Sequence, residues 1–275
     1  MRKLVAAGSA VLAICATGTA VALAGAGSGP SATITARVDE HTVHFSRPLH
    51  AGLLRLHIVS TGVEPHHLIF WQLNPGVTFK QFAATQNRGN PFKLSRIVGG
   101  NGQLAPGTTM DIWIHVAKGR LVVMDIPAGN GKGFARNFTV SASGPSAAVP
   151  TALGVVAALP TDRYRVPPGF AAAGTWEFDN TDSEAHEASI VRLSAGKTVA
   201  DLVSWAKHGE KGFPPIDGLK RGVWGGFGAL SGHSHAWFTH GTLPAGNYAL
   251  VCFLPGPNGM PHLAMGMAAP FTVSG

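Results

Sequence analysis

One stretch of nineteen residues occurs twice in this chain, and this repeat limits the possible folds more than any other feature of the sequence. Residues 60–78 (STGVEPHHLIFWQLNPGVT) align without a gap on residues 180–198 (NTDSEAHEASIVRLSAGKT), at an offset of 120 residues. Further matches follow in the same order, as Trp113 corresponds to Trp237 and the Phe-Thr-Val of residues 138–140 to that of residues 271–273. The repeat predicts two copies of one fold.

Strands are predicted in both copies. Apolar runs rich in β-branched and aromatic residues occupy residues 53–59, 67–71, 121–124 and 248–252, with Gly or Pro nearby. Gly and Pro together make up 55 of 275 residues, which favours short strands joined by many turns. At the end of the repeated stretch, Thr78 and Thr198 each stand three residues before a side chain that can complete a capping box, so each copy should contain one short helix. The predicted fold class is all-β, with two Greek-key β-sandwich domains.

The N-terminal segment and the limits of the two copies predict how the chain is divided. A basic start and an apolar run from Leu4 to about Ala24 are typical of a Sec-type signal peptide, predicted at residues 1–26, although a retained membrane anchor is the alternative. Residues 30–140 should form the N-terminal domain, residues 141–160 a linker and residues 161–275 the C-terminal domain. The protein should therefore be secreted or extracytoplasmic, with the cell envelope as one such location, and Cys15 should leave with the signal peptide.

Candidate metal ligands gather in the second copy only. Cys252 ends an apolar strand, and the loop after it contains His262, Met265 and Met267, whereas the matching loop of the first copy is five residues shorter. His186 supplies a second imidazole from within the repeated stretch. Thiolate, imidazole and thioether donors together select copper over zinc or magnesium.

The order of His186, Cys252, His262 and Met267 resembles that of the cupredoxins, the blue-copper family to which plastocyanin and azurin belong. The resemblance implies one type 1-like copper ion in the C-terminal domain, with Met267 as axial ligand and Met265 as second choice. It also implies single-electron transfer or extracytoplasmic copper handling, with a redox partner protein. The family places two to a few residues between the cysteine and the second histidine, but nine intervene here. Three prolines and the Asn258-Gly259 turn can fold this loop back. The spacing still leaves open a rearranged centre, a metal bound without blue-copper spectra, or no metal.

Other functions remain open on the sequence alone. His186 by itself also fits a histidine that fixes its loop, since His66 holds the same place in the first copy. A metal-free secreted binding or envelope protein is therefore the alternative. A copper oxidase or nitrite reductase is less favoured, because the pair His233 and His235 lacks the further His-X-His motifs of those enzymes and should face solvent, as an exposed pair or a weak second metal site.

Several classes lack support in the sequence. No hydrolase or phosphate-loop motif occurs, so an electron carrier or binding protein is favoured over an enzyme and no catalytic residue is predicted. No basic run interleaved with aromatic residues occurs, so no nucleic-acid partner is expected. No stable membrane span is expected once the signal peptide is removed.

Overall fold

The computed structural model describes residues 33–85, 90–126, 133–217 and 223–275. The predicted signal peptide at residues 1–26 and Cys15 lie outside these ranges, so both stay predictions. Within the described residues, no helix is long and apolar enough to cross a membrane.

The N-terminal half of the described chain contains β1 (Thr33–Val38), β2 (Val43–Phe45), β3 (Leu49–His50), β4 (Gly52–Ser60), β5 (Leu68–Leu73), α1 (Phe79–Thr85), the 3-10 turn η1 (Pro91–Lys93), β6 (Ser95–Gln103), β7 (Thr109–Val116), β8 (Gly119–Asp125) and β9 (Ala135–Ser141). The C-terminal half contains β10 (Val155–Leu159), β11 (Arg163–Arg165), β12 (Gly174–Asn180), β13 (His186–Arg192), α2 (Val199–Lys207), β14 (Val223–Leu230), β15 (Ser234–His240), β16 (Gly246–Val251), α3 (His262–Met265) and β17 (Ala268–Val273).

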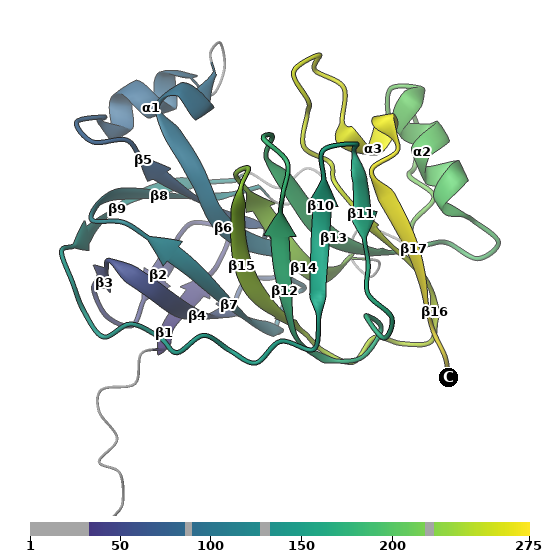
Figure 1. Cartoon of the computed structure of the whole chain (residues 1–275), viewed down its shortest axis with the longest axis horizontal. Helices are drawn as coiled ribbons and strands as arrows, with labels where there is room; N and C mark the ends of the chain where they lie inside the picture. The colour runs from purple at the N-terminus through teal and green to yellow at the C-terminus, as the bar shows by residue number, and fades with distance from the viewer. Residues whose placement is uncertain (1–32, 86–89, 127–132, 218–222) are drawn as a thin grey trace, which may run out of the picture. The chain divides into compact units, whose positions relative to one another are not determined.

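Two sheets contain all of these strands, and both run through the two halves (Figure 1). The first sheet has the order β11-β10-β12-β15-β7-β4-β1-β2, and the second has the order β17-β16-β13-β14-β6-β5-β8-β9-β3. The halves join where β15 pairs antiparallel with β7 and β14 with β6. Trp237 lies opposite Trp113 at the first of these junctions, so the two positions that the sequence comparison matched are direct neighbours.

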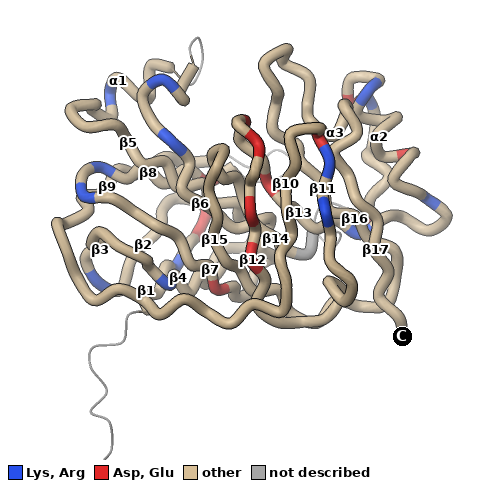
Figure 2. The backbone as a smooth tube through the Cα atoms, in the orientation of Figure 1, with Lys and Arg blue, Asp and Glu red and all other residues tan. Residues whose placement is uncertain are grey.

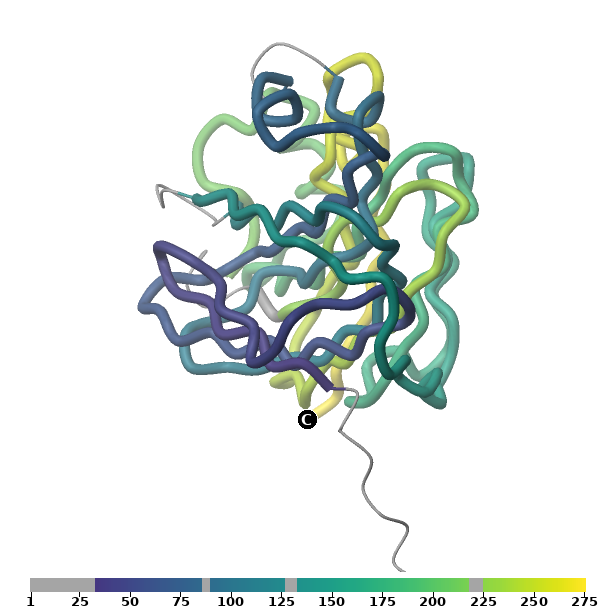
Figure 3. The backbone as a smooth tube through the Cα atoms, turned by 90° about the vertical axis from the view of Figure 1, so that its left-hand side faces the viewer, coloured from purple at the N-terminus to yellow at the C-terminus, as the bar shows by residue number. Residues whose placement is uncertain are grey.

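One apolar core fills the space between the sheets. It includes Phe70 and Ile112 from the N-terminal half and Phe227 and Phe238 from the C-terminal half, all completely buried. Figure 3 shows the strands of the N-terminal half as two layers, with α1 above the upper one. The all-β fold class is confirmed. The predicted domain limits stay a prediction, and β10 begins at Val155, inside the segment predicted as linker.

The two helices predicted from the repeat cover the outer face of the second sheet. Phe82 of α1 belongs to the same apolar cluster as Trp71 of β5, and Leu202 of α2 to the same cluster as Val251 of β16. The capping box of α2 is present, because Thr198 Oγ1 accepts a hydrogen bond from the Asp201 backbone while the Asp201 carboxylate accepts one from the Thr198 backbone. Helix α2 therefore supports the strands that lead into the site described next.

Candidate metal centre

The strands β13 and β16 bring two of the predicted ligands together. They are antiparallel neighbours, with Ser189 opposite Val251. His186 is the first residue of β13, and Cys252 directly follows the last residue of β16. Both side chains are completely buried. Because antiparallel neighbours place the start of one strand beside the end of the other, these two residues meet at one end of the sandwich.

The long segment between Cys252 and His262 closes on itself. Pro255 forms an antiparallel bridge with Pro261, and the amide of Gly256 donates to the carbonyl of Met260 at 2.8 Å. The amide of His262 then donates to the carbonyl of Leu254 at 2.9 Å, and α3 starts at His262. Nine intervening residues therefore span only a short distance, and His262 returns to the side of Cys252.

Three donor atoms converge inside this end of the sandwich. Nδ1 of His186 lies 3.0 Å from Nδ1 of His262, and Sγ of Cys252 lies 3.3 Å from Nδ1 of His262 and 3.8 Å from Nδ1 of His186. A point equidistant from the three atoms is about 2.0 Å from each, which is close to a metal–imidazole bond length and somewhat shorter than a metal–thiolate bond. The triangle fits a single ion of the size of a first-row transition metal.

The outer nitrogen of each imidazole is held by a carboxylate. Nε2 of His186 lies 3.0 Å from Oδ2 of Asp182, and Nε2 of His262 lies 2.9 Å from Oε2 of Glu184. An ionised carboxylate only accepts hydrogen bonds, so each Nε2 carries the proton and each Nδ1 is left with a lone pair. Two nitrogen lone pairs and a sulfur then face one another in a buried space, an arrangement that a bound cation stabilises.

Burial and nearby acids set the charge of the site. Burial lowers the pKa of His186, and the hydrogen bond to Asp182 opposes this effect only in part, so the ring is neutral at neutral pH. Burial raises the pKa of the Cys252 thiol well above its ordinary value, and the Glu187 carboxyl group adds to this effect. Without a metal the sulfur therefore keeps its proton, and a metal that binds there must displace it.

The fourth predicted ligand, Met267, is completely buried in the same apolar cluster as Cys252. The backbone amide of Cys252 donates a hydrogen bond to the carbonyl of Met267 at 3.3 Å. Met265 lies toward the loop surface instead, where its sulfur is 3.8 Å from the side-chain nitrogen of Asn258. The role of Met267 as axial ligand stays a prediction, as does Met265 as the second choice.

The matching place in the N-terminal half is a hydrogen-bonded pair. Nδ1 of His66 lies 2.7 Å from Oδ2 of Asp125, and both side chains are almost completely buried. Met124 stands where the second half has Cys252. Among the described residues, two groups of three His, Cys or Asp side chains have donor atoms that all lie within 4.8 Å of one another, and both contain His186, the second being Asp162, Asp182 and His186. His66 therefore serves the local structure, in line with the expectation from the sequence.

The carboxylates around the site were not predicted from the sequence. Asp182 and Glu184 lie four and two residues before His186, inside the repeated stretch. Gly62 occupies the place of Asp182 in the first copy, so this difference between the copies was the available signal. Glu187 was missed as well. It is buried, and its Oε1 accepts a hydrogen bond from the amide of Phe253, directly after the thiol residue.

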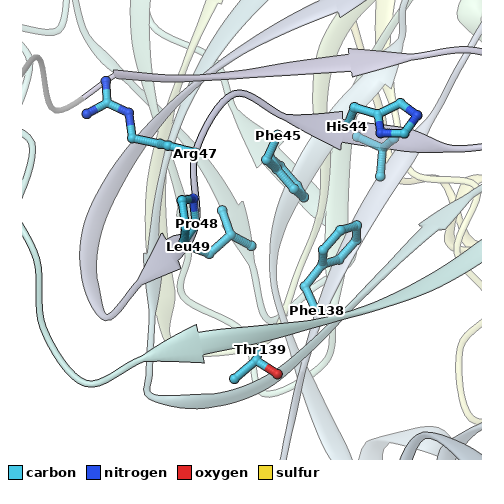
Figure 4. Close-up of a pocket in the computed structure, with 8 residues that line it drawn as sticks. His44, Phe45, Arg47, Pro48, Leu49, Phe138 and Thr139 are labelled. Carbon is cyan, nitrogen blue, oxygen red and sulfur yellow. The ribbon is translucent and has the colours of Figure 1, made fainter.

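An open pocket of about 400 Å³ lies elsewhere, in the N-terminal half (Figure 4). Phe45, Leu49 and Phe138 form its apolar part, with His44 and Arg47 among the other lining residues. None of the four predicted metal ligands lines it, so it takes no part in the centre.

Comparisons with known proteins concern the fold alone. No protein-family model and no curated protein matches the chain. Among solved structures, it is similar to auracyanin B, at 19% identity over 46% of this chain and 94% of that one, with a TM-score of 0.31. It is also similar to the dithionite-reduced auracyanin of Roseiflexus castenholzii, at 22% identity over 44% and 96% of the two chains, with a TM-score of 0.30. A multicopper oxidase matches at 13% identity over 88% of each chain, with a TM-score of 0.24.

Proposed function

We propose that this protein binds one copper ion through His186, Cys252 and His262, with Met267 as a weak axial ligand, and acts in single-electron transfer or copper handling outside the cytoplasm. The observation that carries the proposal is the buried triangle of two Nδ1 atoms and one Sγ atom. Two imidazoles and one thiolate are the equatorial ligands of a type 1 copper site.

The surrounding residues support a cation of this kind. Asp182 and Glu184 orient the two imidazoles so that their lone pairs point inward. Glu187 fixes the backbone next to Cys252 through the amide of Phe253. Copper would supply the ability to gain and lose one electron. The protein holds its ligands on two strands and a closed loop, so the ligands need to move little when the charge of the ion changes.

The proposal is tested by titrating the metal-free protein with Cu(II). We expect one equivalent to produce an intense thiolate-to-copper absorption band in the visible range, and Cys252→Ser to abolish it. Met267→Leu should keep the band and raise the reduction potential, since the axial ligand tunes that potential. Met265→Leu is the matched control and should leave the potential unchanged.

A second matched pair separates metal binding from structural damage. His186→Gln and His66→Gln remove corresponding buried imidazoles from the two halves. Only His186→Gln should lose the visible band, provided that circular dichroism shows both variants folded. A wild-type protein that stays colourless and retains no stoichiometric copper would refute the proposal and support the metal-free binding protein instead.

A further inference from the structure

A second pair of histidines meets on the outer face of the first sheet. His115 of β7 and His235 of β15 come from different halves of the chain. The pairing of Trp237 with Trp113 fixes the register of these antiparallel strands, and the same register places His235 opposite His115. The two ring centroids are 6.1 Å apart. The pair therefore exists only because the two halves share a continuous sheet.

Both rings are accessible to a ligand from solvent. The side chain of His235 is half-exposed, and His115 is exposed as well. No hydrogen bond between described residues holds either ring. Each ring instead contacts Trp237, with centroid distances of 5.1 Å for His235 and 6.4 Å for His115. Small rotations of the two side chains therefore break no hydrogen bond, and the ion pair of His235 with Glu177 joins the ring to a residue that can itself bind the metal.

Acidic residues of the neighbouring strand β12 lie on the His235 side of the pair. Oε1 of Glu177 lies 3.9 Å from Nδ1 of His235, and Asp179 is the cross-strand neighbour of His235. Figure 2 shows the acidic residues of β12 as a run beside β15. Burial lowers the pKa of His115, and His235 and Arg96 lower it further, so this imidazole is neutral and able to bind a metal at neutral pH.

The separation of the rings fits one shared ion. A metal bound to imidazole at about 2.0–2.1 Å lies about 3.2 Å from the ring centroid, so two rings on one ion are at most about 6.4 Å apart. The observed 6.1 Å falls within this limit. Two imidazoles with a carboxylate and water suit divalent ions of the late first transition row, and Cu(II) binds most tightly among them.

We propose that His115 and His235, assisted by Glu177, form a surface site for one divalent transition-metal ion at the junction of the two halves. The site uses none of the residues of the buried centre. His233, which the sequence motif paired with His235, lies before β15, and its amide donates to the carbonyl of Asp182. In this proposal His115, from the other half of the chain, takes the place of His233 as the partner of His235.

The test is a calorimetric titration of the full chain with Cu(II), followed in parallel by tryptophan fluorescence. Wild-type protein should bind a second equivalent that is removed by a chelator and that quenches fluorescence, because Trp237 contacts both rings. His115→Gln and His235→Gln should each weaken this step by at least about tenfold, equal to about 1.4 kcal/mol. His57→Gln is the control in the same sheet. Since the His57 ring is already paired with Asp111, this variant should bind Cu(II) like wild type.

The Cys252→Ser variant keeps the two sites distinguishable. It should show the Cu(II)-dependent quenching whether or not the buried centre holds copper in the wild-type protein, and where the wild type has the visible band of that centre, the variant should lose it. An unchanged affinity for the quenching step in the folded double variant of His115 and His235 would overturn the proposal. So would the lack of any such step in the wild-type protein, and the pair would then be an aromatic contact only.

Discussion

The two carboxylates that hold the imidazoles of the buried centre should contribute unequally to copper affinity. Asp182 is mostly buried, with its side chain 12% exposed, whereas the side chain of Glu184 is 37% exposed. Asp182 also accepts backbone hydrogen bonds from Ser183 and Glu184 through Oδ1, while Oδ2 binds His186. We predict that Asp182→Asn weakens copper binding much more than Glu184→Gln does.

The expected loss of copper affinity follows from the hydrogen bonds that an amide can form at each of the two positions. In Asp182→Asn, the amide oxygen is needed by the two backbone donors, so the amide nitrogen faces Nε2 of His186. A donor there favours the tautomer with its proton on Nδ1, which blocks the inward lone pair. Loss of such an outer partner costs about 10–100-fold in metal affinity. In Glu184→Gln, the exposed amide can turn its oxygen toward His262, so the loss should be about fivefold or less, as for an exposed pair.

The assay is competition for Cu(I) with a chromophoric chelator, at one pH and with circular dichroism as the folding control. Wild type, Asp182→Asn and Glu184→Gln are compared as metal-loaded full chains. Equal affinities of the two variants, or an Asp182→Asn variant as tight as wild type, would refute the reasoning that the buried carboxylate sets the tautomer of His186.

Two further predictions concern the closed loop and a buried histidine. Replacing residues 256–260 by Asn-Gly should keep the visible copper band, because Pro255 already pairs with Pro261 and the two residues form a tight turn; a colourless but folded variant would contradict this. Burial lowers the pKa of His67 from 6.5 to about 4, so between these pH values the unfolded chain binds more protons than the folded one. As the pH falls through this window, His67 therefore lowers the free energy of unfolding by up to about 3 kcal/mol. The free energy of unfolding of the metal-free protein, measured in urea, should fall from pH 6.5 to pH 4 by up to this amount more for wild type than for His67→Gln. The titration of the neighbouring Glu187 is common to both proteins and cancels in this difference; parallel pH profiles of the two proteins would count against the prediction.

The chemistry of the donors made the centre predictable in part. A thiol, imidazoles and a thioether occur in the second copy and are missing from the matching loop of the first, which singled out His186, Cys252 and His262 by residue type and position alone. The fold brings these three side chains together. The prolines of the loop and its Asn258-Gly259 turn indicate that the loop can fold back, but the side-chain pattern does not specify the backbone hydrogen bonds that close it, such as that from His262 to Leu254.

By itself, the sequence determined the local elements and the set of donors. Apolar runs rich in β-branched and aromatic residues indicate strands such as β4 and β16, and a Thr-to-Asp spacing indicates the start of α2, because these depend on near neighbours in the chain. Only the tertiary structure decided which strands of the two halves pair, and with that the contact between His115 and His235, which are 120 residues apart. Register between distant strands follows from packing of the shared core, which no local pattern encodes.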